Sequence, residues 1–249
     1  MNAATARRPR GREVPPSLNR KSAMRTQRSD WPALRRMIGR ARLPAAYRFE
    51  LLQRDDVPAL VAALRIWFPE ISVGSASCYL SERFYRDHVH FRGEPARDVL
   101  VVVIKRRSEL AGLFSCERDR STLSLYARLG LIAPAHRRVG LSRSFPTLAE
   151  AIGRSAGMEM IYGMATLKVP HVQRVLETQG WQLIGITPGY DREMVAPGVI
   201  KRVYEAVYAK VLVARAGLLR PHTDNLTENT LAFFRLLFPG HSEGPARKA

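Results

Sequence analysis

The spacing of the apolar residues changes after Pro95, and this change constrains the fold more than any other feature. Three apolar stretches, 98–107, 109–119 and 121–133, follow one another with only short polar turns between them. Each is rich in Val, Ile, Leu or aromatic residues, and the first is apolar on both faces, as an interior β-strand is. Because short turns join antiparallel neighbours, we expect the three strands to pair antiparallel. An antiparallel sheet is therefore predicted at the centre of the fold.

Beyond this centre, helices and strands alternate. Residues 141–156 place apolar side chains at helical spacing, and Gly157 suits the end of that helix. A strand is predicted at 158–168 and a helix at 170–180, with Pro170 in its first turn. Such a strand–helix–strand crossover belongs to a sheet that is not purely antiparallel.

The flanking segments complete the sheet. Alternating polar and apolar residues at 47–56 predict a half-buried strand, and helical spacing predicts a helix at 57–67. Two closing strands are predicted at 181–186 and 203–212, separated by a loop at 187–201. The predicted fold class is α/β (α+β), with one mixed, mostly antiparallel sheet and helices on both of its faces.

Positive charge gathers at the start of the chain. The formal net charge is +18, and residues 1–43 hold twelve arginines and lysines but only two acidic residues. A segment that repels itself and carries few apolar residues is expected to be disordered, with room for one short helix at 31–41. Four interpretations stay open for it: a solvated tail, an arm for nucleic acid or an anionic membrane, a dock for an acidic protein, and an organelle-targeting peptide.

Three regions follow from these patterns: a basic arm at 1–43, a folded domain at 44–213, and an extension at 214–249 with one amphipathic helix near 225–238. Two cysteines exclude a disulfide framework. No apolar run approaches the roughly 20 residues that span a bilayer, and the first residues lack the apolar stretch of a secretory signal. We therefore expect a cytoplasmic protein without a transmembrane segment.

An arginine-rich turn, APAHRRVGLSRS at 133–144, lies between the strand at 121–133 and the helix that follows. A glycine just before a helix lets backbone N–H groups approach an oxyanion, and the helix N-terminus adds about half a positive charge. Arg137, Arg138 and Arg143 increase the positive potential. The turn is therefore a candidate phosphate site, and the alternative is an ordinary turn with solvated arginines.

The order of elements, together with this turn, resembles the GCN5-related N-acetyltransferase superfamily over residues 47–212. The superfamily motif, Arg/Gln-x-x-Gly-x-Gly/Ala, is matched by Arg137, Gly140 and Ser142, with serine in place of the usual glycine or alanine. The resemblance implies that acetyl-CoA is the acyl donor. Its pyrophosphate would then be held by the turn residues Arg137, Arg138, Val139, Gly140, Leu141 and Ser142.

The preceding LGLIAP segment adds a second match. In the superfamily, this strand parts from its neighbour at a bulge and opens a slot for the pantetheine arm. The resemblance implies that backbone groups of Leu131, Ile132 and Ala133 bind that arm. It also implies that the N–H group of Ile132 polarises the thioester carbonyl, a form of electrostatic catalysis. Pro134 fits this scheme because proline cannot continue a ladder of hydrogen bonds.

The acid and the base of the reaction are less apparent. Relatives often carry a carboxylate or a histidine on the fourth strand, whereas this chain has only Tyr126 there. Relatives also place a tyrosine on the fourth helix to protonate the thiolate, and Leu176, in the helix predicted at 170–180, stands in its place. The candidate catalytic residues are therefore Tyr126, with Glu117 at the end of the third strand and Glu70 after the first helix of the domain. His88 and His90 lack a third ligand, so no metal site is predicted.

The leading hypothesis is an acetyl-CoA-dependent N-acetyltransferase in which a primary amine attacks the thioester directly. The acceptor is a small molecule or a protein amine, and the oligomeric state is open. A second hypothesis keeps the chemistry but gives the enzyme a longer acyl donor. A third makes the protein an acyl-CoA sensor or a nucleic-acid-associated protein with a catalytically weak fold, which Leu176 and the bare fourth strand favour.

Overall fold

The computed structural model describes residues 30–239, and one seven-stranded sheet organises them. Along the sheet the strands follow the order β1-β2-β3-β4-β5-β7-β6. The pair β4–β5 is parallel and all the other pairs are antiparallel, so the predicted mixed sheet is confirmed. The strands are β1 (Tyr47–Leu51), β2 (Val99–Arg106), β3 (Glu109–Asp119), β4 (Ser124–Ile132), β5 (Met160–Thr166), β6 (Gln182–Ala196) and β7 (Val199–Val211).

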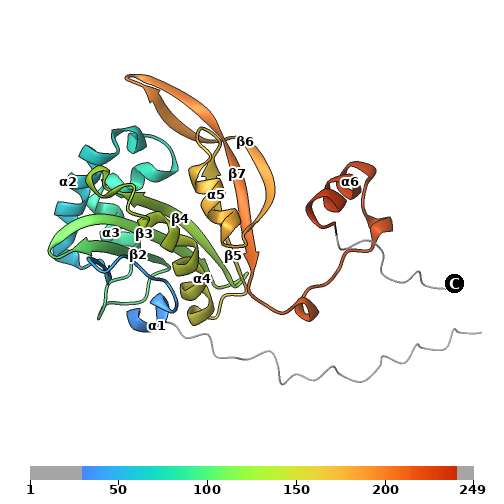
Figure 1. The fold of residues 1–249 in the computed structure, drawn as a ribbon, viewed down its shortest axis with the longest axis horizontal. Helices are drawn as coiled ribbons and strands as arrows, with labels where there is room; N and C mark the ends of the chain where they lie inside the picture. The colour runs from blue at the N-terminus through green and yellow to red at the C-terminus, as the bar shows by residue number, and fades with distance from the viewer. Residues whose placement is uncertain (1–29, 240–249) are drawn as a thin grey trace, which may run out of the picture.

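Helices cover both faces of this sheet (Figure 1). One face carries α1 (Leu34–Ile38), α4 (Ser144–Ala156) and α5 (His171–Thr178), and the other carries α2 (Val57–Trp67) and α3 (Glu82–His88). The apolar strand β2 explains why two layers are needed. Its even-numbered residues from Leu100 to Ile104 pack with α1 and α4, and its odd-numbered residues from Val99 to Val103 pack with α2 and α3. Because both faces of β2 are buried from Val99 to Ile104, this part of the strand is apolar throughout.

The folded domain begins earlier than the sequence indicates. The arm was expected to include residues up to 43, but Trp31, Met37 and Ala41 are buried in the core beside α4. The indole N–H of Trp31 donates to the backbone carbonyl of Arg97 at 2.8 Å. The predicted short helix within 31–41 is confirmed as α1. The segment 31–41 has few apolar residues among its arginines. The spacing of these apolar residues places them on one side of the segment, which packs against the core. Residues 1–29 of the expected arm lie outside the described residues.

The closing strands are longer than predicted. The segment 187–201, expected to be a loop, belongs to a ribbon in which β6 pairs with β7 as far as Ala196 and Val199. An irregularity between Thr187 and Asp191 absorbs the Pro-Gly that suggested a loop, since a bulge tolerates a residue without a ladder N–H. The ribbon projects beyond the other strands (Figure 1).

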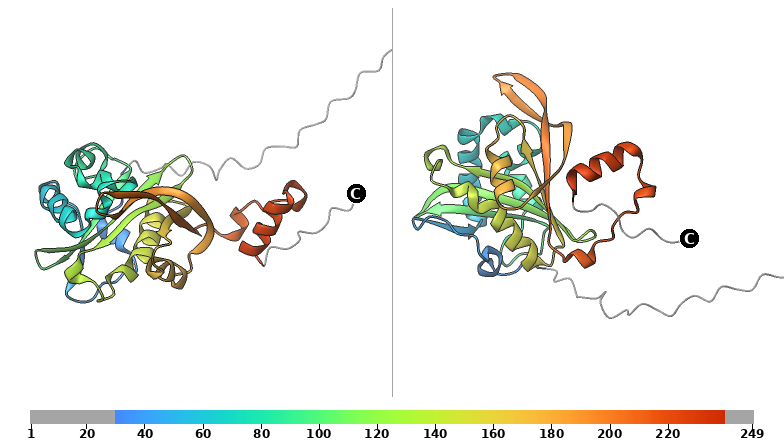
Figure 2. Two further views of the ribbon diagram at one scale, coloured as in Figure 1. Left: turned by 90° about the horizontal axis from the view of Figure 1, so that it is seen from above. Right: turned by 45° about the vertical axis from the view of Figure 1, so that its right-hand side comes forward.

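The C-terminal extension carries α6 (Glu228–Leu237), close to the helix predicted at 225–238. Thr227 caps it by accepting a hydrogen bond from the backbone N–H of Thr230. Figure 2 shows α6 to one side of the main body of the domain, and none of its residues is buried. The side chain of Gln182 on β6 donates a hydrogen bond to the carbonyl of Leu237 at the end of α6. None of the helices within residues 30–239 is long and apolar enough to cross a membrane.

Candidate active site

Strands β4 and β5 pair at one end and separate at the other. Their parallel register runs from Ser124 and Met160 to Ala127 and Gly163 and stops there, although both strands continue. On the other side of β4, Ser115 of β3 pairs with Leu129 and the next residue of β3 pairs with Ala127, so one extra residue, Arg128, forms a bulge. A bulge bends the strand that carries it. The splayed pair at a bulge, expected from the resemblance, is therefore present.

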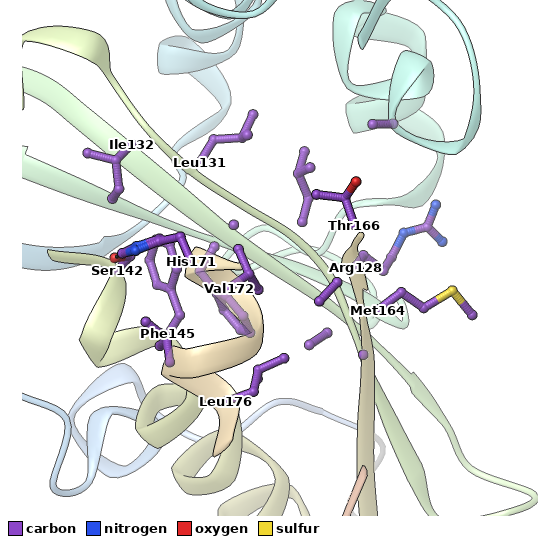
Figure 3. A pocket seen from close by; sticks show the side chains of 18 of the residues that line it. Arg128, Leu131, Ile132, Ser142, Phe145, Met164, Thr166, His171, Val172 and Leu176 are labelled. Carbon is purple, nitrogen blue, oxygen red and sulfur yellow. Dashed lines mark hydrogen bonds between the residues drawn. The ribbon is translucent and has the colours of Figure 1, made fainter. Parts of the chain in front are cut away.

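A cavity of about 770 Å³ occupies this opening. Leu131 and Ile132 of β4 border it on one side, and Met164 and Thr166 of β5 border it on the other (Figure 3). The cavity continues past α4 and α5 to the arginine-rich turn, and in the opposite direction to the inner side of the β6–β7 ribbon. Its volume is within the usual range for sites that bind small molecules and cofactors.

The turn between β4 and α4 has the backbone geometry of an anion site. Arg138 and Gly140 adopt positive φ angles of 66° and 86°. The backbone N–H groups of residues 138–142 donate to no acceptor within the described part of the chain. A side chain built at Gly140 would meet no atom within 4 Å, so the space in front of this glycine is open. Consecutive free N–H groups beside an open space are what a phosphate needs.

The charged and polar side chains of this turn differ in their roles. Arg138 and Arg143 line the cavity and leave positive charge beside the free N–H groups. Arg137 also lines the cavity, and its side chain is held by other groups of the wall: its Nε donates to the carbonyl of Ile132 at 3.3 Å, and its guanidinium lies 5.2 Å from the centre of the Phe68 ring. Ser142 Oγ lies 3.0 Å from His171 Nε2 at the start of α5, which links the two helices that border the opening (Figure 3).

The other residues expected at the donor site lie at different depths. Leu131, Ile132 and Leu141 line the cavity. Ala133 does not, because its side chain is buried and its N–H already donates to the carbonyl of Ala111 at 2.9 Å. Val139 is exposed at the tip of the turn and lies outside the cavity wall. The N–H group of Ala133, which was expected to bind pantetheine, is therefore already used within the sheet.

The three candidate catalytic residues are not equivalent. Tyr126 lines the cavity and stacks on Tyr162 with ring centres 5.0 Å apart, and burial raises its pKa, so it holds its proton. Glu70 also lines the cavity, in the turn after α2. Glu117 is absent from the cavity wall and is bound by Arg128 in an ion pair. Because it lies outside the cavity wall and is already paired, Glu117 is the weakest of the three candidates.

Two further sequence observations have a structural counterpart. Leu176, which stands where relatives carry a tyrosine, is buried in α5 and lines the cavity. It offers no proton to the site. His88 lies at the end of α3 and His90 is buried. Among residues 30–239, no three His, Cys, Asp or Glu side chains gather in a way that would hold a metal ion.

Sequence reasoning missed Glu205, a buried carboxylate of the cavity. It lies on β7, directly opposite Thr166 of β5 and Thr187 of β6, and only 8% of its surface is exposed. Burial, together with the charges of Glu193 and Asp191, raises the pKa of Glu205 to about 7. The one signal in the sequence was that Glu205 is the only acidic residue in this strand. What the residue faces became visible only in the folded chain.

This buried acid predicts an unusual dependence of stability on pH. The unfolded chain releases the proton near 4.5 and the folded chain near 7, so the folded state binds more protons between these values. The free energy of unfolding should therefore fall as pH rises through this window, by on the order of 3 kcal/mol. Glu205→Gln should remove this fall and make the protein more stable than the wild type at pH 8. Urea unfolding of both proteins at pH 5 and pH 8 measures the free energy of unfolding. An equal change between the two pH values in both proteins would contradict the prediction.

Searches among proteins of known structure found the same fold in spermidine N-acetyltransferases. Mutant forms of the spermidine/spermine N-acetyltransferase of Vibrio cholerae match with a TM-score of 0.53 and 16% identity, over 68% of this chain and 95% of the other. A structure of spermidine N-acetyltransferase from the same organism, in complex with CoA and spermine, matches with a TM-score of 0.52 and 15% identity, over 68% of this chain and 96% of the other.

The similarity to these structures identifies the fold of the chain. It has the fold of the GCN5-related N-acetyltransferases, so the resemblance inferred from the sequence is confirmed at the level of the fold. A scan against models of protein families found no match, and a search among curated proteins found no significant one. Because the sequence identities are low, the chemistry must be argued from the residues of this chain.

Proposed function

We propose that this protein transfers an acetyl group from acetyl-CoA to a primary amine by direct attack in a ternary complex. The observation that carries the proposal is the cavity that joins two unlike ends through the opening between β4 and β5. One end has the free N–H groups and arginines of the turn, and the other has acidic side chains. A donor with a diphosphate and an acceptor with a positive charge would meet where the strands separate.

The donor end fits a nucleotide diphosphate joined to a long arm. The pyrophosphate would lie against the N–H groups of residues 138–142, where Arg138 and Arg143 add charge. The pantetheine would then enter the opening between β4 and β5, and its thioester would come to rest beside the backbone of Ile132. The N–H of Ile132 keeps its expected role as the group that polarises the thioester carbonyl. No metal is required by this scheme.

The acceptor end fits an amine. Glu70, Asp191, Glu193 and Glu205 line the cavity on the side away from the turn. Carboxylates attract an ammonium ion, and the similar Vibrio cholerae enzyme is described in complex with spermine. Asp191 also accepts hydrogen bonds from the backbone N–H and the hydroxyl of Ser75, at 2.8 and 2.6 Å, which attach the β6–β7 ribbon to the wall opposite. The acceptor would therefore enter between this ribbon and the turn after α2.

The proposal is tested by incubating the full chain with acetyl-CoA and a panel of primary amines that includes spermidine, putrescine, benzylamine and a lysine peptide. Release of thiol, followed with a thiol reagent, should exceed the rate without amine for at least one member. Mass spectrometry should find that amine heavier by one acetyl group. Preference for a longer acyl-CoA in the same assay would support the alternative donor. No transfer to any amine would contradict the proposal.

A second candidate function is an acyl-CoA-binding sensor, and Leu176 is the observation that favours it. This apolar side chain fills the position from which a tyrosine would protonate the departing thiolate. A protein that binds acetyl-CoA saturably, without thiol release above background for any amine, would fit this candidate. The nucleic-acid interpretation depends mainly on residues 1–29, which lie outside the described part of the chain. DNA binding that weakens steeply with salt and disappears without those residues would support it.

A further inference from the structure

We propose that Glu205 is the catalytic base of this protein: it binds the acceptor as a primary ammonium ion and removes its proton. This inference rests on the acetyl transfer proposed above and adds to it the residue that activates the nucleophile. Three observations lead to it, namely the position of Glu205 beside the opening, the absence of a partner for its carboxyl group, and the charges around it.

The position of Glu205 follows from strand register. Glu205 stands directly opposite Thr166, and both side chains lie on the face of the sheet that carries Met164. Met164 and Thr166 belong to the part of β5 that has separated from β4 (Figure 3). The carboxyl group is therefore one strand away from the opening in which the thioester would lie, and it borders the same cavity. An amine held by Glu205 would be placed beside the thioester rather than at the mouth of the site.

Of the other acids near this end of the cavity, Glu70 is only half-buried, and the remaining two are already engaged. Glu193 forms an ion pair with Lys168, and Asp191 accepts two hydrogen bonds from Ser75. Within residues 30–239, no side chain or backbone group forms a hydrogen bond or an ion pair with the carboxyl group of Glu205. The residue is largely buried, while its carboxyl oxygens remain open to the cavity. A largely desolvated carboxyl group without a partner costs stability, and an ammonium ion in the cavity would supply that partner.

The groups around Glu205 give it a pKa that suits a general base. The groups that face Glu205 are Glu193 and Asp191 on β6, which favour its protonated form, and Lys168 after β5, which favours its ionised form. Burial adds to the effect of the acids, and the resulting pKa of about 7 lies close to neutral pH. A general base works best when its pKa is near the pH at which the enzyme operates. Tyr126, one of the residues expected to act, also lines this cavity, but burial raises its pKa so far that it holds its proton too tightly to serve as a base.

The reaction balances without any further reactant. One proton moves from the ammonium group to a carboxylate oxygen of Glu205, which leaves a lone pair on nitrogen. That pair forms the C–N bond with the thioester carbon, and the carbonyl electrons shift to oxygen. When the carbonyl reforms, the C–S bond breaks and sulfur leaves with its electron pair. The nitrogen releases its second proton to the thiolate through water, so CoA leaves as the thiol, and Glu205 returns its proton to solvent.

The first test measures the proton affinity of Glu205 without any substrate. In the full chain labelled with ¹³C at glutamate carboxyl groups, we expect one glutamate resonance to titrate with a midpoint near pH 7. Glu205→Gln should remove that resonance and no other. If every glutamate titrates below about pH 5.5, as ordinary glutamates do, the inference is wrong whether or not the protein is a transferase.

The second test measures the transfer itself, with the fastest amine of the panel and with hydrazine, which is small and largely neutral at pH 8.5. For the amine, Glu205→Gln should lower kcat by at least about 100-fold and remove the acid limb of the pH profile. For hydrazine, which has no proton to lose before attack, the loss should be less than about 10-fold. The affinity for acetyl-CoA should stay the same, which shows that the variant is folded.

Two control variants separate this role from a general effect of charge. Glu94→Gln removes an exposed acid that pairs with Arg54 far from the cavity, and the rate should not change. Glu193→Gln removes a charge that raises the pKa of Glu205, so the midpoint of the acid limb should move to lower pH. Equal rates for the wild type and Glu205→Gln would overturn the inference and leave the transferase function standing. Absence of transfer by the wild type would overturn the proposed function instead.

Discussion

Gly140→Asp should weaken the binding of acetyl-CoA about 30-fold. A carboxylate at this position would extend into the open space in front of the turn, where the pyrophosphate is expected, because no atom lies within 4 Å of an added Cβ. Repulsion between like charges a few ångströms apart at a protein surface is worth about 2 kcal/mol, which corresponds to that factor. Isothermal titration calorimetry with acetyl-CoA measures the change directly.

The backbone at Gly140 has to be taken into account in this experiment. Its φ of +86° is strained for any other residue, at a cost of about 1 kcal/mol. Gly140→Ala carries the same strain without the charge and should retain most of the affinity. Gly93→Asp is the matched control elsewhere, because Gly93 also has a positive φ and open space around it but lies outside the cavity wall. Unchanged affinity in a folded Gly140→Asp would remove the pyrophosphate from this turn.

Trp31→Ala should lower the free energy of unfolding by about 4 kcal/mol, although the residue belongs to a segment that the sequence assigns to a basic arm. Truncation of a buried aromatic side chain to alanine typically costs 3–5 kcal/mol. Here the indole is buried, the guanidinium of Arg118 lies 4.3 Å from the centre of its ring, and its N–H donates to the carbonyl of Arg97. Urea unfolding of the full chain measures the loss, and the urea dependence shows whether the transition is still cooperative.

Controls for this prediction use surface residues and truncations. Leu219→Ala, at a side chain that is 99% exposed, should change stability by less than about 0.5 kcal/mol. Removal of residues 1–29 should leave both the stability and the affinity for acetyl-CoA intact. Removal of residues 1–43 should destabilise the domain, because it also deletes Met37, which is fully buried. If both truncations behave alike, the packing of α1 contributes nothing and the boundary near residue 44 stands.

Much of the fold could be predicted because its signals are local. The apolar run at 98–107 indicated an interior strand, and it proved to be β2 with both faces covered. The strand at 109–119 coincides with β3. The Pro-Gly at 188–189 led to the wrong prediction of a loop. A proline disrupts a ladder of hydrogen bonds only at a position where the strand must donate an N–H group. A bulge removes that need, and whether one forms is decided by the partner strand.

The candidate site likewise has some features that the sequence predicts and others that only the tertiary structure reveals. By itself, the sequence determined the antiparallel centre of the sheet, the crossover that follows it, and the glycine-bearing turn at 137–142, because side-chain period and turn chemistry are properties of neighbours along the chain. Only the tertiary structure decided that Trp31 belongs to the core, that Arg137 binds the carbonyl of Ile132, and that Glu117 is paired while Glu205 is not. Burial and proton affinity depend on groups that are far apart in the chain and meet only when the sheet has formed.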